Sequence, residues 1–113
     1  MSVSKIEDLR TRIDEIDRQL VALLGERASC ALAVGRLKEL AGMPIYQPAR
    51  EAEVLSNVRA ANAGPLDDEA MVRLFERIID EARRLERLAS AAHSGDGEPP
   101  AGTLESKRRS NSE

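Results

Sequence analysis

The stretch SKIEDLRTRIDEIDRQLVALLGERASCALAVGRLKELA, residues 4–41, decides the fold. Its large apolar side chains recur at alternating steps of three and four residues, the period of a helix with one buried stripe. This apolar stripe consists of Ile6, Leu9, Ile13, Ile16, Leu20, Leu23, Cys30, Val34 and Leu37. Ser4 with Glu7 three residues later fits a capping box, and Gly42 followed by Pro44 ends the pattern. The sequence therefore predicts one unbroken helix over residues 4–41.

The length of this predicted helix has a consequence for assembly. At about 1.5 Å per residue it is roughly 55 Å long, whereas a compact chain of about 100 residues has a radius of gyration of only ~13 Å. The helix must extend beyond any domain that one chain can build, so part of its apolar stripe needs another cover. A second copy of the chain, in a symmetric intertwined homodimer, is the simplest cover.

Two shorter helices are predicted after the long one. Pro48, a residue that suits the first helical position, begins the second helix. The third begins at Asp67 or Asp68, where an aspartate can cap free amides, and its apolar pattern fades after Leu88. We therefore expect an all-α fold with three helices in each chain.

The last part of the chain differs in composition from the rest. Residues 90–113 contain several glycines and prolines and almost no large apolar side chain. Such a segment cannot bury enough apolar surface to become ordered. The sequence thus predicts a helical domain at residues 1–89 and a disordered polar tail at residues 90–113.

Composition limits the partners and the compartment. A net charge of −3, with one tyrosine, one phenylalanine and no tryptophan, offers neither the clustered cations nor the aromatic surface that nucleic-acid binding requires. We find no apolar run that fits a bilayer span or a secretory signal, and one cysteine cannot form an internal disulfide. No histidine or cysteine has a partner at metal-ligand spacing. We expect a cytoplasmic protein without metal or cofactor that binds neither nucleic acid nor membrane.

Two cations stand in line with the apolar stripe. The position after Leu23 in the pattern is Arg27, and Lys38 lies eleven residues further on. At about 100° per residue, eleven residues return to within ~20° of the same face, some 16 Å along the axis. Because a buried unpaired cation is strongly destabilising, an anion of small-molecule size is expected between them. The alternative is that both cations reach solvent or pair with carboxylates of the other helices.

Further polar residues of the second and third helices are predicted to lie near Arg27 and Lys38. Arg50 and Glu51 open the second helix, where free amides and the helix dipole favour an anion. On the third helix, Glu86 lies beside the apolar face rather than opposite it. Arg10 lies seventeen residues before Arg27 and roughly 100° around the long helix, so the two cannot share a pocket within one chain. In an antiparallel dimer, Arg10 could reach the pocket of the other copy.

The sequence resembles a known family in four motifs. It resembles the all-helical class of chorismate mutases. The matching motifs are Leu9-Arg10-x-x-Ile13-Asp14-x-Ile16-Asp17, Leu20-x-x-Leu23-Leu24-x-Glu26-Arg27, Val34-Gly35-x-x-Lys38 and Pro48-x-Arg50-Glu51. The resemblance extends over about residues 6–88. Members fused to or partnered with the heptulosonate-phosphate synthase that opens the shikimate pathway look most similar, through Gly64-Pro65-Leu66 and Leu74-Phe75-x-x-Ile78-Ile79.

The resemblance implies a reaction and a set of roles. Members are intertwined dimers that convert chorismate to prephenate in aromatic amino acid biosynthesis, without a cofactor. The residues that match Arg27 and, from the other chain, Arg10 clamp the two carboxylates of chorismate. The match to Lys38 binds the side-chain carboxylate and the ether oxygen. The match to Glu51 takes the ring hydroxyl, and the match to Arg50 supports the site.

This reaction suits a site that has no nucleophile and no base. It is a pericyclic shift, so an enzyme helps mainly by holding the dianion in a compact, chair-like conformer. The breaking C–O bond leaves negative charge on the ether oxygen, which a fixed cation such as Lys38 stabilises. Arginine binds carboxylates through two parallel hydrogen bonds, which explains arginine at the clamps.

Three positions depart from the family's usual pattern. Gln47 stands where many members have Asp, and Ala82 stands where a Ser or Thr often assists a carboxylate. Glu86 stands at the position that donates to the ether oxygen, where members usually have Gln and sometimes Glu. Only a protonated carboxyl can donate there, and the ionised form would repel the developing charge. Burial would raise the pKa of Glu86, whereas Lys38 and Arg27 would lower it, and the sequence leaves that balance open.

Other functions fit part of the same pattern. An isochorismate–pyruvate lyase uses the same scaffold and a similar charged pocket. A non-catalytic regulatory or partner-binding helical module would bind prephenate or a synthase with little turnover. A plain coiled-coil adaptor would favour leucine or isoleucine at the position of Arg27.

Overall fold

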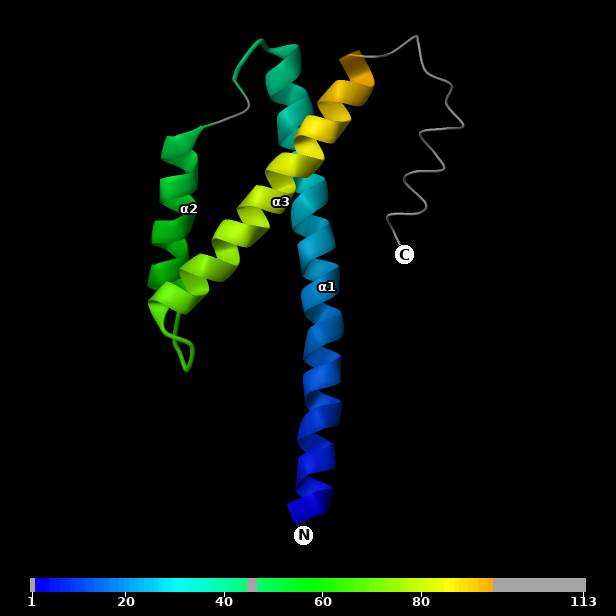
Figure 1. Ribbon diagram of the computed structural model, residues 1–113, viewed down its shortest axis with the longest axis vertical. Helices are drawn as coiled ribbons and strands as arrows, with labels where there is room; N and C mark the ends of the chain where they lie inside the picture. The colour runs from blue at the N-terminus through cyan, green and yellow to red at the C-terminus, as the bar shows by residue number, and fades with distance from the viewer. Residues whose placement is uncertain (1, 45–46, 95–113) are drawn as a thin grey trace.

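The computed structural model describes residues 2–44 and 47–94, which form three helices (Figure 1). These are α1 (Ser2–Leu40), α2 (Pro48–Ala61) and α3 (Asp68–Ser94). The described residues contain no strand, so the predicted all-α architecture with one very long first helix is confirmed. None of these three helices is long and apolar enough to span a membrane.

Two helix boundaries differ from the predicted ones. α1 begins two residues ahead of Ser4, so Ser4 lies inside the helix and is not its N-cap. α3 continues six residues beyond Leu88, through the first part of the predicted tail. The cause of this extension is a tertiary contact, because the hydroxyl of Ser90 donates a hydrogen bond to the carboxylate of Glu39 on α1. The rest of the predicted tail, residues 95–113, lies outside the described residues.

Local signals set the other ends. α1 stops at Gly42, which has a φ of 71°. The N–H of Gly42 donates to the carbonyl of Glu39 at 3.1 Å, and the N–H of Met43 donates to the carbonyl of Lys38 at 2.8 Å. This pair of bonds is a Schellman motif, which satisfies the last free carbonyls of a helix. At the start of α3, the side chain of Asp67 accepts a hydrogen bond from a first-turn N–H at 2.8 Å, as expected of a capping aspartate.

The three helices leave much of α1 without a neighbour. α3 lies across the C-terminal half of α1 and packs against α2, while the N-terminal half of α1 extends away from both (Figure 1). The radius of gyration is 18.4 Å and the longest dimension is 63 Å, compared with a radius of about 13 Å for a compact chain of this length. The overhang predicted for the first helix is therefore present.

One chain alone buries little apolar surface. Val72 on α3 is the one buried hydrophobic side chain among the described residues, and it is still 6% exposed. By contrast, the large apolar side chains of α1 are exposed along almost its whole length; they are Val3, Ile6, Leu9, Ile13, Ile16, Leu20, Val21, Leu23, Leu24, Val34, Leu37 and Leu40. A continuous apolar surface of this kind marks an interaction surface.

Candidate active site

All three helices contribute to one cavity of about 270 Å³, which we call the three-helix cavity. It is lined by Arg27, Cys30, Ala31, Val34, Lys38, Gln47, Arg50, Glu51, Val54, Ile79, Ala82, Arg83 and Glu86. Every residue that the sequence assigns to the site lies in this lining, except Arg10. The predicted residues therefore come together although they are spread over three separate helices.

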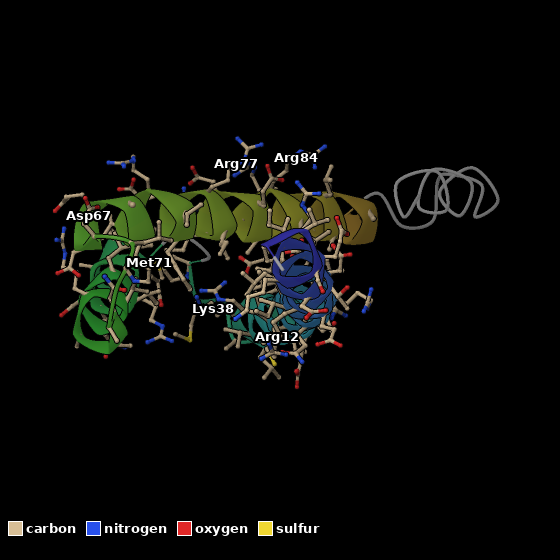
Figure 2. The ribbon with its side chains drawn as sticks, turned by 90° about the horizontal axis from the view of Figure 1, so that it is seen from below. Arg12, Lys38, Asp67, Met71, Arg77 and Arg84 are labelled. Carbon is tan, nitrogen blue, oxygen red and sulfur yellow. The ribbon has the colours of Figure 1, made fainter. Side chains whose placement is uncertain are left out.

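The two cations of the long helix face the same space. Arg27 and Lys38 both line the three-helix cavity and are partly buried. The apolar side chains of Ala31 and Val34 lie between them on the same wall. In the view along α1, Lys38 occupies the space between α1 and α2 that α3 covers (Figure 2). The eleven-residue spacing thus places two positive charges at separate levels of one cavity.

Glu86 faces these cations from α3. Partial burial raises the pKa of its carboxyl above the ordinary value. The positive charges of Lys38, Arg83 and Arg27 lower that pKa without cancelling the rise. Burial therefore affects the pKa of Glu86 more than the three cations do. The sequence alone left this balance open.

Glu86 packs against a glycine of α1. Gly35 is buried, and a Cβ built on it would lie 3.4 Å from Cγ and 3.5 Å from Cδ of Glu86. Any larger side chain at this position would meet the carboxyl group. α1 therefore packs closely against α3 at Gly35, where a methyl group would be in van der Waals contact with Glu86.

An ion pair joins α2 to α3 at the edge of the cavity. Glu51 pairs with Arg83, and the two side chains are only 30% and 26% exposed. Sequence reasoning missed Arg83 as a site residue. The signal was present, because Arg83 lies four residues after Ile79 and three before Glu86, on the same face of α3.

The start of α2 presents polar groups to the cavity. Gln47 is the N-cap residue, but its side-chain oxygen accepts no hydrogen bond from the first N–H groups of α2 in the described part of the chain. Arg50 forms an ion pair with Glu53 at 2.8 Å, in which both side chains are exposed. Such a solvent-exposed pair contributes little, so Arg50 keeps its charge available to an anion. Ala82 on α3 also lines the cavity and provides a methyl group and no hydroxyl.

Arg10 lies apart from the cavity. It is on the N-terminal half of α1, seventeen residues before Arg27 and so about 25 Å along the helix axis. Its side chain is exposed and forms a 3.3 Å ion pair with Glu7, one turn away. The separation within one chain is as expected from the helical spacing.

Comparison with known proteins identifies relatives over most of the chain. The sequence model of the family described as chorismate mutase type II matches residues 9–87. A bifunctional chorismate mutase/prephenate dehydratase from Stutzerimonas stutzeri is 40% identical over 106 residues, which are 88% of this chain and 28% of that protein. The chain thus spans just over a quarter of the length of this bifunctional relative.

Shorter relatives match over nearly their full length. A chorismate mutase from Methanocaldococcus jannaschii is 29% identical over 86 residues, which are 75% of this chain and 87% of that protein. The solved structure of chorismate mutase (form II) from Thermus thermophilus superposes with a TM-score of 0.72 at 37% identity. The match covers 74% of this chain and 94% of that one. The chain belongs to the chorismate mutase type II family.

Proposed function

We propose that this chain catalyses the rearrangement of chorismate to prephenate, with the three-helix cavity as its active site. The observation that carries the proposal is the convergence of Arg27, Lys38 and Arg50 on one cavity in a chain whose net charge is −3. A small dianion is the complementary ligand for such a cavity. Membership of the chorismate mutase type II family supports chorismate as that dianion.

The cations would fix the dianion in its reactive conformer. Arg27 binds one carboxylate, and Arg10 of a second copy binds the other. Glu51 accepts a hydrogen bond from the ring hydroxyl, and Arg50 supports the site from the first turn of α2. Holding both ends of the molecule favours the compact, chair-like conformer over the extended ones, which lowers the entropic part of the barrier. Gln47 and Ala82 contact the substrate without adding charge.

The charge that develops during the reaction falls on the ether oxygen. Lys38 stabilises that charge as a fixed cation. Protonated Glu86 donates a second hydrogen bond to the same oxygen, and the raised pKa of Glu86 supports this protonation state. No proton leaves the protein in the reaction, and no cofactor takes part.

The active form would be an intertwined homodimer. The exposed apolar side chains of α1 support this, because a second α1 that runs antiparallel would cover them. Such an arrangement can bring Arg10 of one copy to the three-helix cavity of the other. A heptulosonate-phosphate synthase as a further partner and a cytoplasmic location remain predictions from the sequence.

The proposal is tested by following chorismate with the purified chain. We expect chorismate to disappear and prephenate to form in equal amounts. Arg27→Ala should reduce kcat/KM by about a hundredfold, since removal of one partner from a charged contact costs a few kcal/mol. Arg73→Ala, an exposed arginine of α3 outside the cavity, is the matched control and should behave like the wild type.

Two outcomes would contradict the proposal. Release of pyruvate from isochorismate at a higher kcat/KM than chorismate turnover would identify a lyase on the same scaffold. Binding of prephenate without turnover of either substrate would identify a non-catalytic module.

A further inference from the structure

Arg83 lines the three-helix cavity but has no role in the proposed mechanism. Its side chain is 26% exposed, whereas that of the next residue, Arg84, is 62% exposed and points away from α1 and α2 (Figure 2). Arginine is seldom withdrawn from water without a partner for its charge, and Arg83 is partly withdrawn. Two adjacent arginines of α3 thus have different environments, and only Arg83 is directed at the site.

The partner of Arg83 is a second residue of the site. Its guanidinium pairs with Glu51, which is itself only 30% exposed. A weaker contact with Asp80, at 3.8 Å on the same helix, involves an exposed carboxylate and is screened by solvent. The pair with Glu51 joins α2 to α3, and α2 packs against α3 and not against α1. Removing one member of such a pair would leave the other as an uncompensated charge.

The pair also sets the charge balance of the cavity. The charged residues of its lining are four cations and two carboxylates: Arg27, Lys38, Arg50, Arg83, Glu51 and Glu86. With Glu86 protonated, as the proposed mechanism requires, and Glu51 ionised, the balance is 4 − 1 = +3, which favours a dianion. Without Arg83 the balance falls to 3 − 1 = +2, and the ionised Glu51 would lose the cation that offsets its repulsion of the ligand.

We propose, on the basis of the proposed function, that Arg83 is a positioning residue that holds the Glu51 carboxylate toward the ring hydroxyl of the bound dianion and offsets its negative charge. Arg83 itself does not touch the substrate. It acts through Glu51, so its effect disappears when Glu51 no longer carries a charge.

A double-mutant cycle tests this role. Arg83→Met, Glu51→Gln and the double variant are compared with the wild type for KM and kcat with chorismate. Arg87→Met, an exposed arginine one turn further along α3 and outside the cavity, is the matched control. Circular dichroism verifies that each variant remains helical.

We expect Arg83→Met to raise KM by about tenfold with a much smaller change in kcat, because an unpaired carboxylate weakens ground-state binding of the dianion. The double variant should have a lower KM than Arg83→Met, because the repelling charge is gone. Arg83→Lys should restore part of the loss, and Arg87→Met should match the wild type.

Three results would overturn the proposal. A KM unchanged in Arg83→Met would show that Arg83 has no role in binding. If the effects of the two single substitutions on KM are additive in the double variant, Arg83 acts on the substrate directly or only on the fold. A wild-type chain that does not turn over chorismate would overturn the proposed function and this role with it, whereas the first two results leave the proposed function intact.

Discussion

A single methyl group at Gly35 tests how the packing of α1 controls Glu86. A Cβ at Gly35 would lie 3.4 Å from Cγ and 3.5 Å from Cδ of Glu86, which is van der Waals contact, so Gly35→Ala should fold. Alanine is favoured over glycine inside a helix by about 1 kcal/mol. We therefore expect the free energy of unfolding to rise by about that amount per chain.

The same methyl group would remove water from the Glu86 carboxyl. Loss of hydration disfavours the ionised form, so the pKa of Glu86, already raised by burial, should rise further. Turnover requires the protonated form in the proposed mechanism and declines as pH rises through this pKa. The decline should therefore move to higher pH in Gly35→Ala.

The pKa shift also fixes the sign of the pH dependence of stability. The folded protein holds the Glu86 proton more tightly than the unfolded chain does. The stability that this proton contributes is therefore complete below the ordinary carboxyl pKa, and it is lost as pH rises through the raised pKa of the folded state.

Gly25→Ala is the matched control on the same helix, because a Cβ at Gly25 has no neighbour within 4 Å in the described chain. Urea unfolding at one fixed chain concentration and the pH profile of kcat are measured for both variants. Both should gain stability, and only Gly35→Ala should shift the pH profile. Identical pH profiles, or a stability loss confined to Gly35→Ala, would refute this explanation of how Glu86 is held.

Further variants test other parts of the site and the assembly. Glu86→Gln donates a hydrogen bond at every pH, so its kcat should stay level where that of the wild type declines; an unchanged pH profile would exclude a role for the Glu86 proton. Ile13→Asp places a charge in the exposed apolar stripe and should yield monomers in sedimentation equilibrium together with a loss of turnover. Arg27→Leu removes a partly buried cation and should raise the melting temperature while turnover falls by about a hundredfold; an active, stabilised variant would instead identify a plain coiled-coil adaptor.

Elements with a local cause were predictable from the sequence. The spacing of Leu9, Ile13 and Ile16 is enough to specify a helix, and Gly42 ends that helix through backbone bonds to its own last turn. The end of α3 was not predictable in this way. Its last residues carry small side chains, so the pattern fades, and the helix continues because Ser90 bonds to a distant part of the chain.

In the site, too, features with a local cause were predictable and features that depend on tertiary contacts were not. Arg27 and Lys38 lie on one helix, so their common direction follows from the helical period. Arg83 lies on the cavity-lining face of α3, but its importance depends on Glu51, which a different helix brings to it. The direction of the pKa shift of Glu86 depends on how far burial outweighs three cations, a balance that exists only in the folded chain.

Mixed dimers test whether each site is shared between two copies. A chain with Arg10→Ala keeps Arg27, and a chain with Arg27→Ala keeps Arg10, so each variant alone should be nearly inactive toward chorismate. Refolding equal amounts together should place both variants in half of the dimers, and each mixed dimer has one complete site of two. We therefore expect about one quarter of the wild-type activity per chain. Mass spectrometry verifies that mixed dimers have formed. If they have formed and the mixture is no more active than the separate variants, Arg10 of the second copy does not complete the chorismate site.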